Sequence, residues 1–275
     1  MSDLSTIKNL SSTLPEQETL MPVLFIGHGS PMNGVENNVF SREWAAVASH
    51  IPQPKAVIVV SAHWFTRGTF VTAMDFPQTI HDFGGFPQDL YDVQYPAPGD
   101  PKLAAETAAM VKGTSIGLDH DWGLDHGAWT VVRHMYPLAN IPVLQLSMDY
   151  TKSPAAHYEL ARELLALRRR GVLIMGSGNM VHNLRMMDWG MINGGGFDWA
   201  LDINDRFKTS ILAGQHDDLI HFERLGHAAR LAIPTPEHYL PLLYTLGLKK
   251  DDEQVTLFND KAVGGSLTMT SVRIG

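Results

Sequence analysis

Short runs of apolar residues, bounded by polar and glycine-containing turns, recur along this chain from residue 22 onwards. Runs of this length and spacing are typical of β-strands with at least one buried face. They predict strands over residues 22–27, 56–61, 69–73, 143–147, 172–176, 255–258 and 267–274.

Between these runs, apolar positions recur at the spacing of amphipathic helices. This pattern predicts helices over residues 102–112, 128–136, 155–170, 199–213, 217–231 and 238–246, with a serine cap and a proline first residue at 153–154. Strands that alternate with helices indicate one α/β domain over residues 21–275, in which helices flank both faces of a central, mostly parallel or mixed sheet. The C-terminal strands could add an antiparallel edge, and residues 1–20 are expected to form a loose N-terminal arm.

One segment, residues 76–99, shows neither the strand pattern nor the helical pattern, and it is rich in proline, glycine and aromatic residues. Its aromatic content argues against disorder, and long irregular loops in compact domains are usually functional. We therefore expect it to form a wall or lid of an active site. Within it, His81 and Asp82 could orient a substrate or simply complete a turn.

The amino-acid composition excludes several kinds of functional site and partner. The chain has no cysteine, which excludes disulfides, thiolate zinc sites, iron–sulfur clusters and cysteine nucleophiles. A formal net charge of −8 argues against a nucleic-acid partner, and the densest basic run, 168–170 before Gly171, is interpreted as the solvated end of a helix. No apolar stretch has the length of a membrane span, and the polar N-terminus lacks a secretion signal, so we expect a cytoplasmic protein.

Histidines follow the ends of several predicted strands. His28 lies between two glycines after the first strand, His63 follows the second, and His182 follows the strand at 172–176 through a Gly-Ser-Gly-Asn turn. Because parallel strands end at one edge of a sheet, these side chains are expected to converge on one crevice. Several imidazoles in a cysteine-free chain suggest a mononuclear metal site with open coordination positions, as in catalytic sites.

Each of these histidines also has a simpler explanation. The glycines around His28 could form an anion-binding turn, and His63 could be a hydrogen-bonded packing residue. Ser177, on the turn before His182, raises the possibility of a serine hydrolase. However, Met175 and Asn179 occupy the outer glycine positions of the nucleophile elbow, so that hypothesis fails.

Two further histidines lie near predicted helix starts. Glu237 and His238 are adjacent, so one of them faces the site, while the alternative is that Glu237 caps the helix and His238 lies on the surface. His126 stands beside a glycine ahead of a helix. The acidic residues around it, Asp125 among them, are interpreted as helix caps that face solvent.

Together, the segments GHGSPMN, SAHWFTRG, TIHDFGGFP, LYDVQYPAPG, GLDHGAW, GSGNMVHNL and PTPEHYLPLLYTLG resemble the DOPA 4,5-dioxygenase family. These enzymes are class III extradiol ring-cleavage dioxygenases, related to the catalytic subunit of protocatechuate 4,5-dioxygenase. The resemblance extends from about residue 21 to residue 275, with the motifs in the family's order.

The resemblance implies a role for each histidine. His28 and His63 correspond to two metal ligands. His238 falls where the wider superfamily has a glutamate ligand, and we favour it over the adjacent Glu237. His182 corresponds to an acid–base residue that could also reach the metal when substrate is absent, and His126 to a second histidine of the substrate pocket.

The implied activity is the insertion of O₂ into a catechol such as L-DOPA at a mononuclear non-haem metal site. Cleavage between ring carbons 4 and 5 gives 4,5-seco-DOPA, which cyclises to betalamic acid. Fe(II) is the expected metal, although the same nitrogen ligands accept Zn(II). The alternatives are a zinc-dependent hydrolase that uses the same histidines and a non-catalytic metal-binding relative. A small-molecule catechol and O₂ are the expected partners.

Overall fold

A computed structural model of the protein describes residues 20–275, so the expected N-terminal arm, apart from Leu20, lies outside the described residues. The strands are β1 (Val23–Gly27), β2 (Ala56–Thr66), β3 (Thr69–Thr72), β4 (Ile116–Asp119), β5 (Val143–Asp149), β6 (Val172–Gly178), β7 (Val255–Phe258), β8 (Ala262–Val263), β9 (Leu267–Thr268) and β10 (Ser271–Ile274). The predicted strand at 267–274 is therefore two strands, and the sequence pattern missed β4 and the two-residue β8.

The helices are α2 (Val39–Ser49), α3 (Gln88–Tyr91), α4 (Pro101–Met110), α5 (His126–Met135), α6 (Pro154–Glu163), α7 (Leu165–Arg169), α8 (Asp198–Leu212), α9 (His216–Ile220), α10 (His227–Ala232) and α11 (Leu240–Gly247), with short 3-10 turns between some of them. Ser153 caps α6 as predicted, with its side chain accepting from the backbone N–H of Ala156. The single helix expected over 217–231 is wrong, because Gly226 adopts a φ of 92° and interrupts it.

Eight strands form one mixed sheet in the order β4-β3-β5-β2-β6-β1-β10-β7. The four central strands, β5, β2, β6 and β1, run parallel, and β10 and β7 add the antiparallel edge that the sequence suggested. The register places Gly27 of β1 opposite Gly178 of β6, and Ser61 of β2 opposite Ser177. The carboxyl ends of β1 and β6 therefore lie side by side, close to β2.

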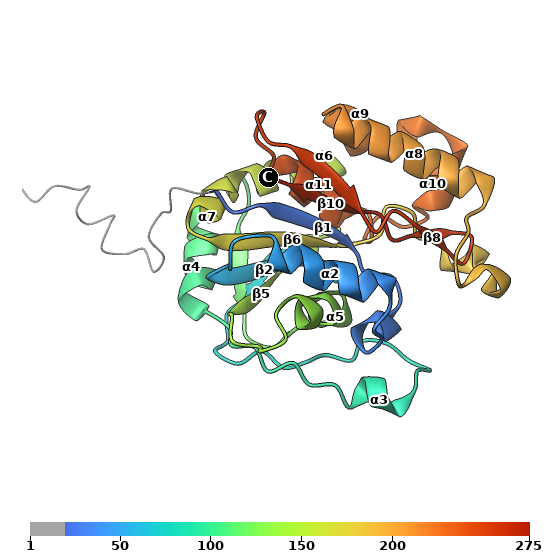
Figure 1. The fold of residues 1–275 in the computed structure, drawn as a ribbon. Helices are drawn as coiled ribbons and strands as arrows, with labels where there is room; N and C mark the ends of the chain where they lie inside the picture. Colours follow the sequence, from blue (N-terminus) through green and yellow to red (C-terminus); the bar gives the residue numbers. More distant parts are fainter. Residues whose placement is uncertain (1–19) are drawn as a thin grey trace, which may run out of the picture.

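Helices cover both faces of the sheet, as Figure 1 shows, with α2 and α5 on one face and α6 and α11 on the other. Alternate residues of β1 enter different cores: Val23 and Phe25 pack with α6 and α11, whereas Leu24 and Ile26 pack with α2 and α5. This alternation is the period of two expected of a strand, and both sets are apolar because both faces are buried. The predicted α/β class and flanked sheet are confirmed.

The basic run at 168–170 is not the solvated helix end that we expected. Gly171 ends the helical segment with a φ of 82°, as predicted, but Arg168 is fully buried. Its guanidinium pairs with Glu253 and donates to the Met21 carbonyl oxygen at 2.7 Å. A buried guanidinium needs such partners, so Arg168 ties the C-terminal segment to the start of β1.

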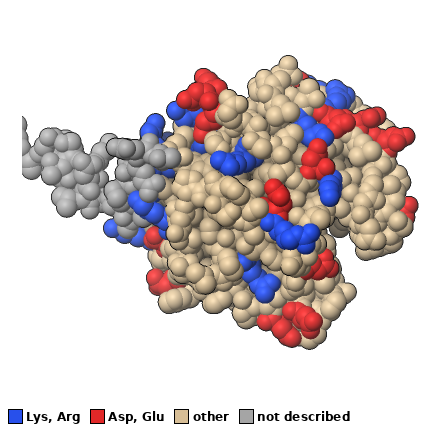
Figure 2. Space-filling model, viewed as in Figure 1, with Lys and Arg blue, Asp and Glu red and all other residues tan. Residues whose placement is uncertain are grey.

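On the face shown in Figure 2, Lys and Arg side chains lie among Asp and Glu side chains. None of the described helices is both long and apolar enough to cross a membrane. The cytoplasmic location and the expected lack of a nucleic-acid partner stay predictions.

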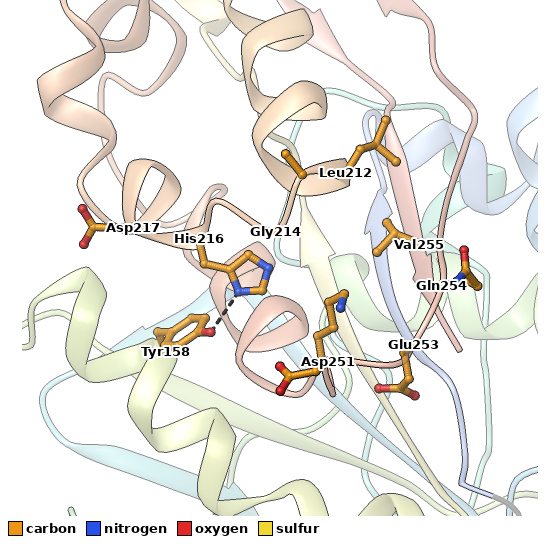
Figure 3. A pocket seen from close by; sticks show the side chains of 11 residues that line it. Tyr158, Leu212, Gly214, His216, Asp217, Asp251, Glu253, Gln254 and Val255 are labelled. Atoms are coloured by element: carbon orange, nitrogen blue, oxygen red, sulfur yellow. Dashed lines mark hydrogen bonds between the residues drawn. The ribbon is translucent and has the colours of Figure 1, made fainter.

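A cleft of about 750 Å³ opens between the end of α8, the start of α9 and residues 249–255 (Figure 3). Polar groups line much of it, including Tyr158, whose hydroxyl lies 2.9 Å from Nδ1 of His216. Val255 at its margin aligns, through β10, with Val23 at the amino end of β1. This cleft therefore lies near the amino end of β1, whereas His28 follows the carboxyl end of the same strand.

Candidate metal site

The first histidine of the site is fixed by the alignment of β1 with β6. The backbone N–H of His28 continues the strand pairing by donating to the Gly178 carbonyl oxygen at 3.1 Å. The side chain is 1% exposed, and its Nδ1 lies 3.0 Å from Oγ of Ser177. Ser177 is therefore a buried partner of His28.

Ser177 also determines which nitrogen of His28 carries the proton. Its hydroxyl donates to the Gly127 carbonyl oxygen at 2.5 Å, so Oγ is left to accept from His28. Nδ1 of His28 must then carry the hydrogen, and Nε2 keeps a free lone pair. A neutral imidazole with a free lone pair is the form that binds a metal.

His63 extends from the carboxyl-terminal half of β2 and faces Asp82 from the irregular loop at 76–99. Oδ2 of Asp82 lies 3.5 Å from Nδ1 of His63. A carboxylate behind a histidine that points its other nitrogen at a metal is a common arrangement in metal sites. It leaves Nε2 of His63 directed at Nε2 of His28, with 3.1 Å between the two nitrogens.

This close approach fits a shared metal ligand set. Two lone pairs that face each other at 3.1 Å repel, unless a cation lies between them. Two Zn–N bonds of about 2.0–2.1 Å separate their nitrogens by roughly 3 Å, depending on the angle at the metal. The ligand atoms of His28, His63 and His238 all lie within 4.8 Å of one another, and the residues therefore fit a single ion.

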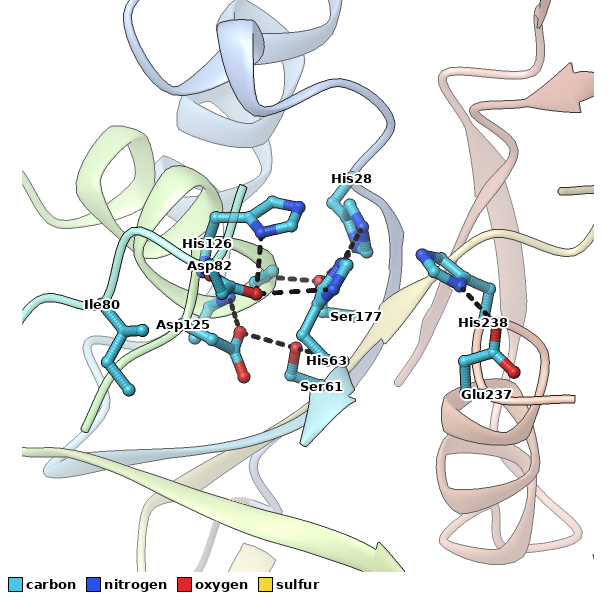
Figure 4. A network of polar contacts seen from close by, with 12 residues as sticks. His28, Ser61, His63, Ile80, Asp82, Asp125, His126, Ser177, Glu237 and His238 are labelled. Carbon is cyan, nitrogen blue, oxygen red and sulfur yellow. Dashed lines mark hydrogen bonds and ion pairs between the residues drawn. The ribbon is translucent and has the colours of Figure 1, made fainter. Parts of the chain in front are cut away.

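His238 enters the site from the turn that precedes α11. The N–H of Asn179 donates to the His238 carbonyl oxygen at 2.8 Å, and a side chain at position 178 would collide with the same oxygen. Gly178 is thus required for the backbones to approach. Figure 4 shows the ring of His238 facing His28 and His63, with Nδ1 turned back toward Oε1 of Glu237 at 3.5 Å.

Burial keeps these three imidazoles neutral. Burial, followed by the neighbouring histidines, lowers the pKa of His28 and of His238 well below the usual value. Burial, followed by the neighbouring His126, lowers the pKa of His63 to about 3. The cationic form of each ring is therefore disfavoured, and neutral histidines are the form that metal binding requires.

His182 lies beside the three-histidine group rather than in it. Its ring stacks on His238, with 3.6 Å between centroids and 6° between planes. Burial lowers the pKa of His182 to about 4, so the ring is neutral near neutral pH and keeps a lone pair on one nitrogen. Its role as a metal ligand stays a prediction.

His126 is the first residue of α5 and lies against His63, with 3.8 Å between ring centroids. Its Nδ1 is 3.0 Å from Oδ2 of Asp82, the same oxygen that faces His63. Phe83, next to Asp82, meets the ring of His126 edge to face. The irregular loop therefore lines the site as predicted, and Asp82 is part of it rather than a simple turn residue.

Asp125 caps α5 as expected, but the expectation that it faces solvent is wrong. The side chain is fully buried and accepts hydrogen bonds from Ser61 at 2.7 Å and from Gln145 at 2.7 Å. Burial, followed by the charge of Asp82, raises the pKa of Asp125. The network joins α5 to β2 and β5, and so fixes His126 relative to His63.

The sequence analysis missed three contributors to this site: the Ser177 hydroxyl, the double contact of Asp82, and the Gln145–Asp125 pair. Each is a pairing between residues far apart in the chain. The TIHDFGGFP segment was the available signal for Asp82, because it puts a carboxylate in the loop expected to form the wall.

Comparison with known proteins identifies the family of this chain. Residues 22–271 match the family described as the catalytic LigB subunit of aromatic ring-opening dioxygenase. Relatives named 4,5-DOPA dioxygenase extradiol include one from Escherichia coli, 48% identical over 94% of this chain and 96% of its own length, and one from Beta vulgaris, 33% identical over 94% and 97%. The crystal structure of an uncharacterized Escherichia coli K12 protein superposes with a TM-score of 0.80 at 43% identity, covering 93% of this chain and all of that one. The chain therefore belongs to the LigB family of aromatic ring-opening dioxygenases.

Proposed function

We propose that this protein is an extradiol dioxygenase that cleaves a catechol such as L-DOPA between ring carbons 4 and 5. The product would be 4,5-seco-DOPA, which cyclises to betalamic acid. The relatives that carry the name 4,5-DOPA dioxygenase extradiol support this substrate class.

The observation that carries the proposal is the convergence of three neutral imidazoles, each with an oxygen behind Nδ1. Ser177 lies behind His28, Asp82 behind His63 and Glu237 behind His238. The three Nε2 atoms are thereby left for one divalent ion. Of the two adjacent candidates in the sequence, His238 is the better ligand, because Glu237 lies on its far side.

An Fe(II) ion bound there would supply a redox-active Lewis acid with coordination positions left open for small ligands. His182 is the proposed base that takes a proton from a catechol hydroxyl, since it is neutral and lies beside His238. His126 is the proposed second proton carrier, because its Nδ1 faces Asp82 and its Nε2 is free to exchange a proton.

The test is O₂ consumption by metal-stripped protein that has been reconstituted anaerobically with Fe(II) or Zn(II) and then given L-DOPA in air. The proposal expects O₂ uptake and a yellow ring-opened product with Fe(II) alone. The Zn(II)-loaded protein is the matched control, because the same nitrogens bind both metals.

Two results would contradict the proposal. One is silence with Fe(II) across L-DOPA and several other catechols, despite one equivalent of bound metal. The other is anaerobic hydrolysis of an ester or amide by the Zn(II)-loaded protein, which would assign the same site to a hydrolase.

A further inference from the structure

Asp82 contacts two histidines that come from separate parts of the fold. Oδ2 lies 3.5 Å from Nδ1 of His63, in β2, and 3.0 Å from Nδ1 of His126, at the start of α5. Oδ1 accepts from the backbone N–H of His126 at 2.8 Å. Asp82 itself belongs to neither element, and Figure 4 shows its carboxylate between the two rings.

The carboxylate acts here as an acceptor only. Its side chain is 18% exposed, and its two oxygens face nitrogens of His63 and His126. An ionised carboxylate offers no hydrogen, so each Nδ1 that faces it must carry one for the contact to be attractive. The contacts with Asp82 therefore favour the Nδ1–H tautomer in both His63 and His126.

The same proton placement serves the two rings differently. In His63 it leaves the Nε2 lone pair facing Nε2 of His28, where the proposed metal binds. In His126 it leaves Nε2 as the nitrogen able to accept a proton. His28 is independent of this arrangement, because Ser177 fixes its tautomer.

We propose that Asp82 is a positioning residue that fixes one tautomer in His63 and His126 together, so that a single carboxylate prepares both a metal ligand and a proton acceptor of the pocket. The tautomers are inferred from the two ion-pair contacts of Asp82. The roles given to the two histidines rest on the proposed function.

An amide in place of the carboxylate should move the proton of each ring from Nδ1 to Nε2. In Asp82→Asn, the amide oxygen is needed at the backbone N–H of His126, which turns the NH₂ group toward both Nδ1 atoms. Donation from NH₂ favours a lone pair on each Nδ1 and moves each proton to Nε2. The Nε2–H of His63 can then donate to Nε2 of His28, 3.1 Å away, and so occupies the space of the metal.

The experiment compares wild type, Asp82→Asn and Asp82→Glu by two readouts. Long-range ¹H–¹⁵N NMR of the imidazoles reports the tautomer of His126, which is not a proposed metal ligand. Competition with a chelator reports the dissociation constant for Zn(II). We expect Nδ1–H on His126 in wild type and Nε2–H in Asp82→Asn, with Zn(II) affinity lowered about 10–100-fold, as for other partners of metal-bound histidines. Asp82→Glu should restore both readouts in part.

Two matched variants separate positioning from a general loss of carboxylate. Asp89→Asn makes the same change at an exposed position of α3, within the same 76–99 segment, and should leave both readouts at wild-type values. Glu237→Gln makes it behind His238 alone, and should lower Zn(II) affinity without changing the tautomer of His126.

The proposal is overturned if His126 carries Nε2–H in wild-type protein, a result that needs no variant to fold. It is also overturned if Asp82→Asn keeps the wild-type tautomer and affinity, or if a second equivalent of Zn(II) binds wild type through His63, Asp82 and His126. Failure of the proposed function looks different: O₂ uptake is absent with every catechol while the tautomer and the Zn(II) affinity respond to Asp82 as expected.

Discussion

Replacing Ser177 by alanine should weaken metal binding far more than it weakens the fold. The hydroxyl is the acceptor for Nδ1 of His28 at 3.0 Å and has no access to solvent. Without it, His28 in the ligand tautomer has a buried N–H with no acceptor, which costs about 1–3 kcal/mol. The alternative tautomer avoids this cost by moving the hydrogen to Nε2, but it then presents a hydrogen where the metal should bind.

The cost should therefore depend on whether metal is present. In the metal-free protein, His28 can change tautomer and donate from Nε2 toward His63, so Tm should fall by only a few °C. In the metal-bound protein the tautomer cannot change, and the full cost appears as a loss of affinity. At about 1.4 kcal/mol for each factor of ten, we expect Zn(II) or Fe(II) affinity to fall about 10–100-fold.

Isothermal titration with Zn(II) and thermal unfolding with and without metal provide the assay. Ser147→Ala is the matched control, since it removes a buried hydroxyl from β5 that accepts from Thr66 and from the backbone N–H of Phe70. It should lower Tm and leave the metal affinity unchanged. Wild-type affinity in Ser177→Ala would refute the argument that this hydroxyl sets the tautomer of His28.

Three further predictions test other parts of the site. His182→Ala should retain metal and fold but lose about 10²–10⁴-fold in kcat under O₂ uptake assay, and normal turnover would move the base role to His126. Gly127→Ala should lower metal affinity, because its Cβ would collide with Ser61 and approach Cδ2 of His63 to 2.9 Å; unchanged affinity would show that α5 can shift. Burial holds the pKa of His182 and of His157 near 4 in the folded protein, against 6.5 when unfolded, so the unfolded chain binds more protons between these values and stability should fall as pH drops from 6.5 to 4. Thermal unfolding across that range checks the sign, and a rising Tm would contradict it.

The sequence was sufficient for the histidines that come after strands, because their placement depends on local pattern. A run of buried residues predicts a strand, and parallel strands bring the residues at their carboxyl ends to one edge of the sheet. His28 and His63 are therefore found together, and so is His182, although its distance from the three-histidine group depends on the turn between β6 and that residue.

The elements that sequence analysis missed bury few residues or are short. Helix α2 buries only Ser41 and Trp44, so its apolar period is weak, and β4 is a four-residue edge strand that contains a glycine. Neither carries a ligand. Their absence from the prediction therefore left the site intact.

The partners of the histidines could not be predicted, because each depends on the register between distant segments. Ser177 reaches His28 only because Gly27 pairs with Gly178, and a shift of one residue would turn the hydroxyl to the other face of the sheet. Asp82 reaches both of its histidines from a loop without periodicity. Spacing along the chain gives no information about either contact.

The chemical type of each partner depends on how deeply its histidine is buried. His28 is 1% exposed and has a hydroxyl behind it, whereas His63 and His238 are backed by carboxylates whose side chains are 18% and 25% exposed. A carboxylate at the depth of Ser177 would lose its hydration, a cost of several kcal/mol that Asp125, at the same depth, offsets with hydrogen bonds from Ser61 and Gln145. The two carboxylates at the rim keep part of their hydration and together balance the charge of one divalent ion. The depth of each ligand therefore explains why a neutral residue supports the innermost histidine and acidic residues support the outer two.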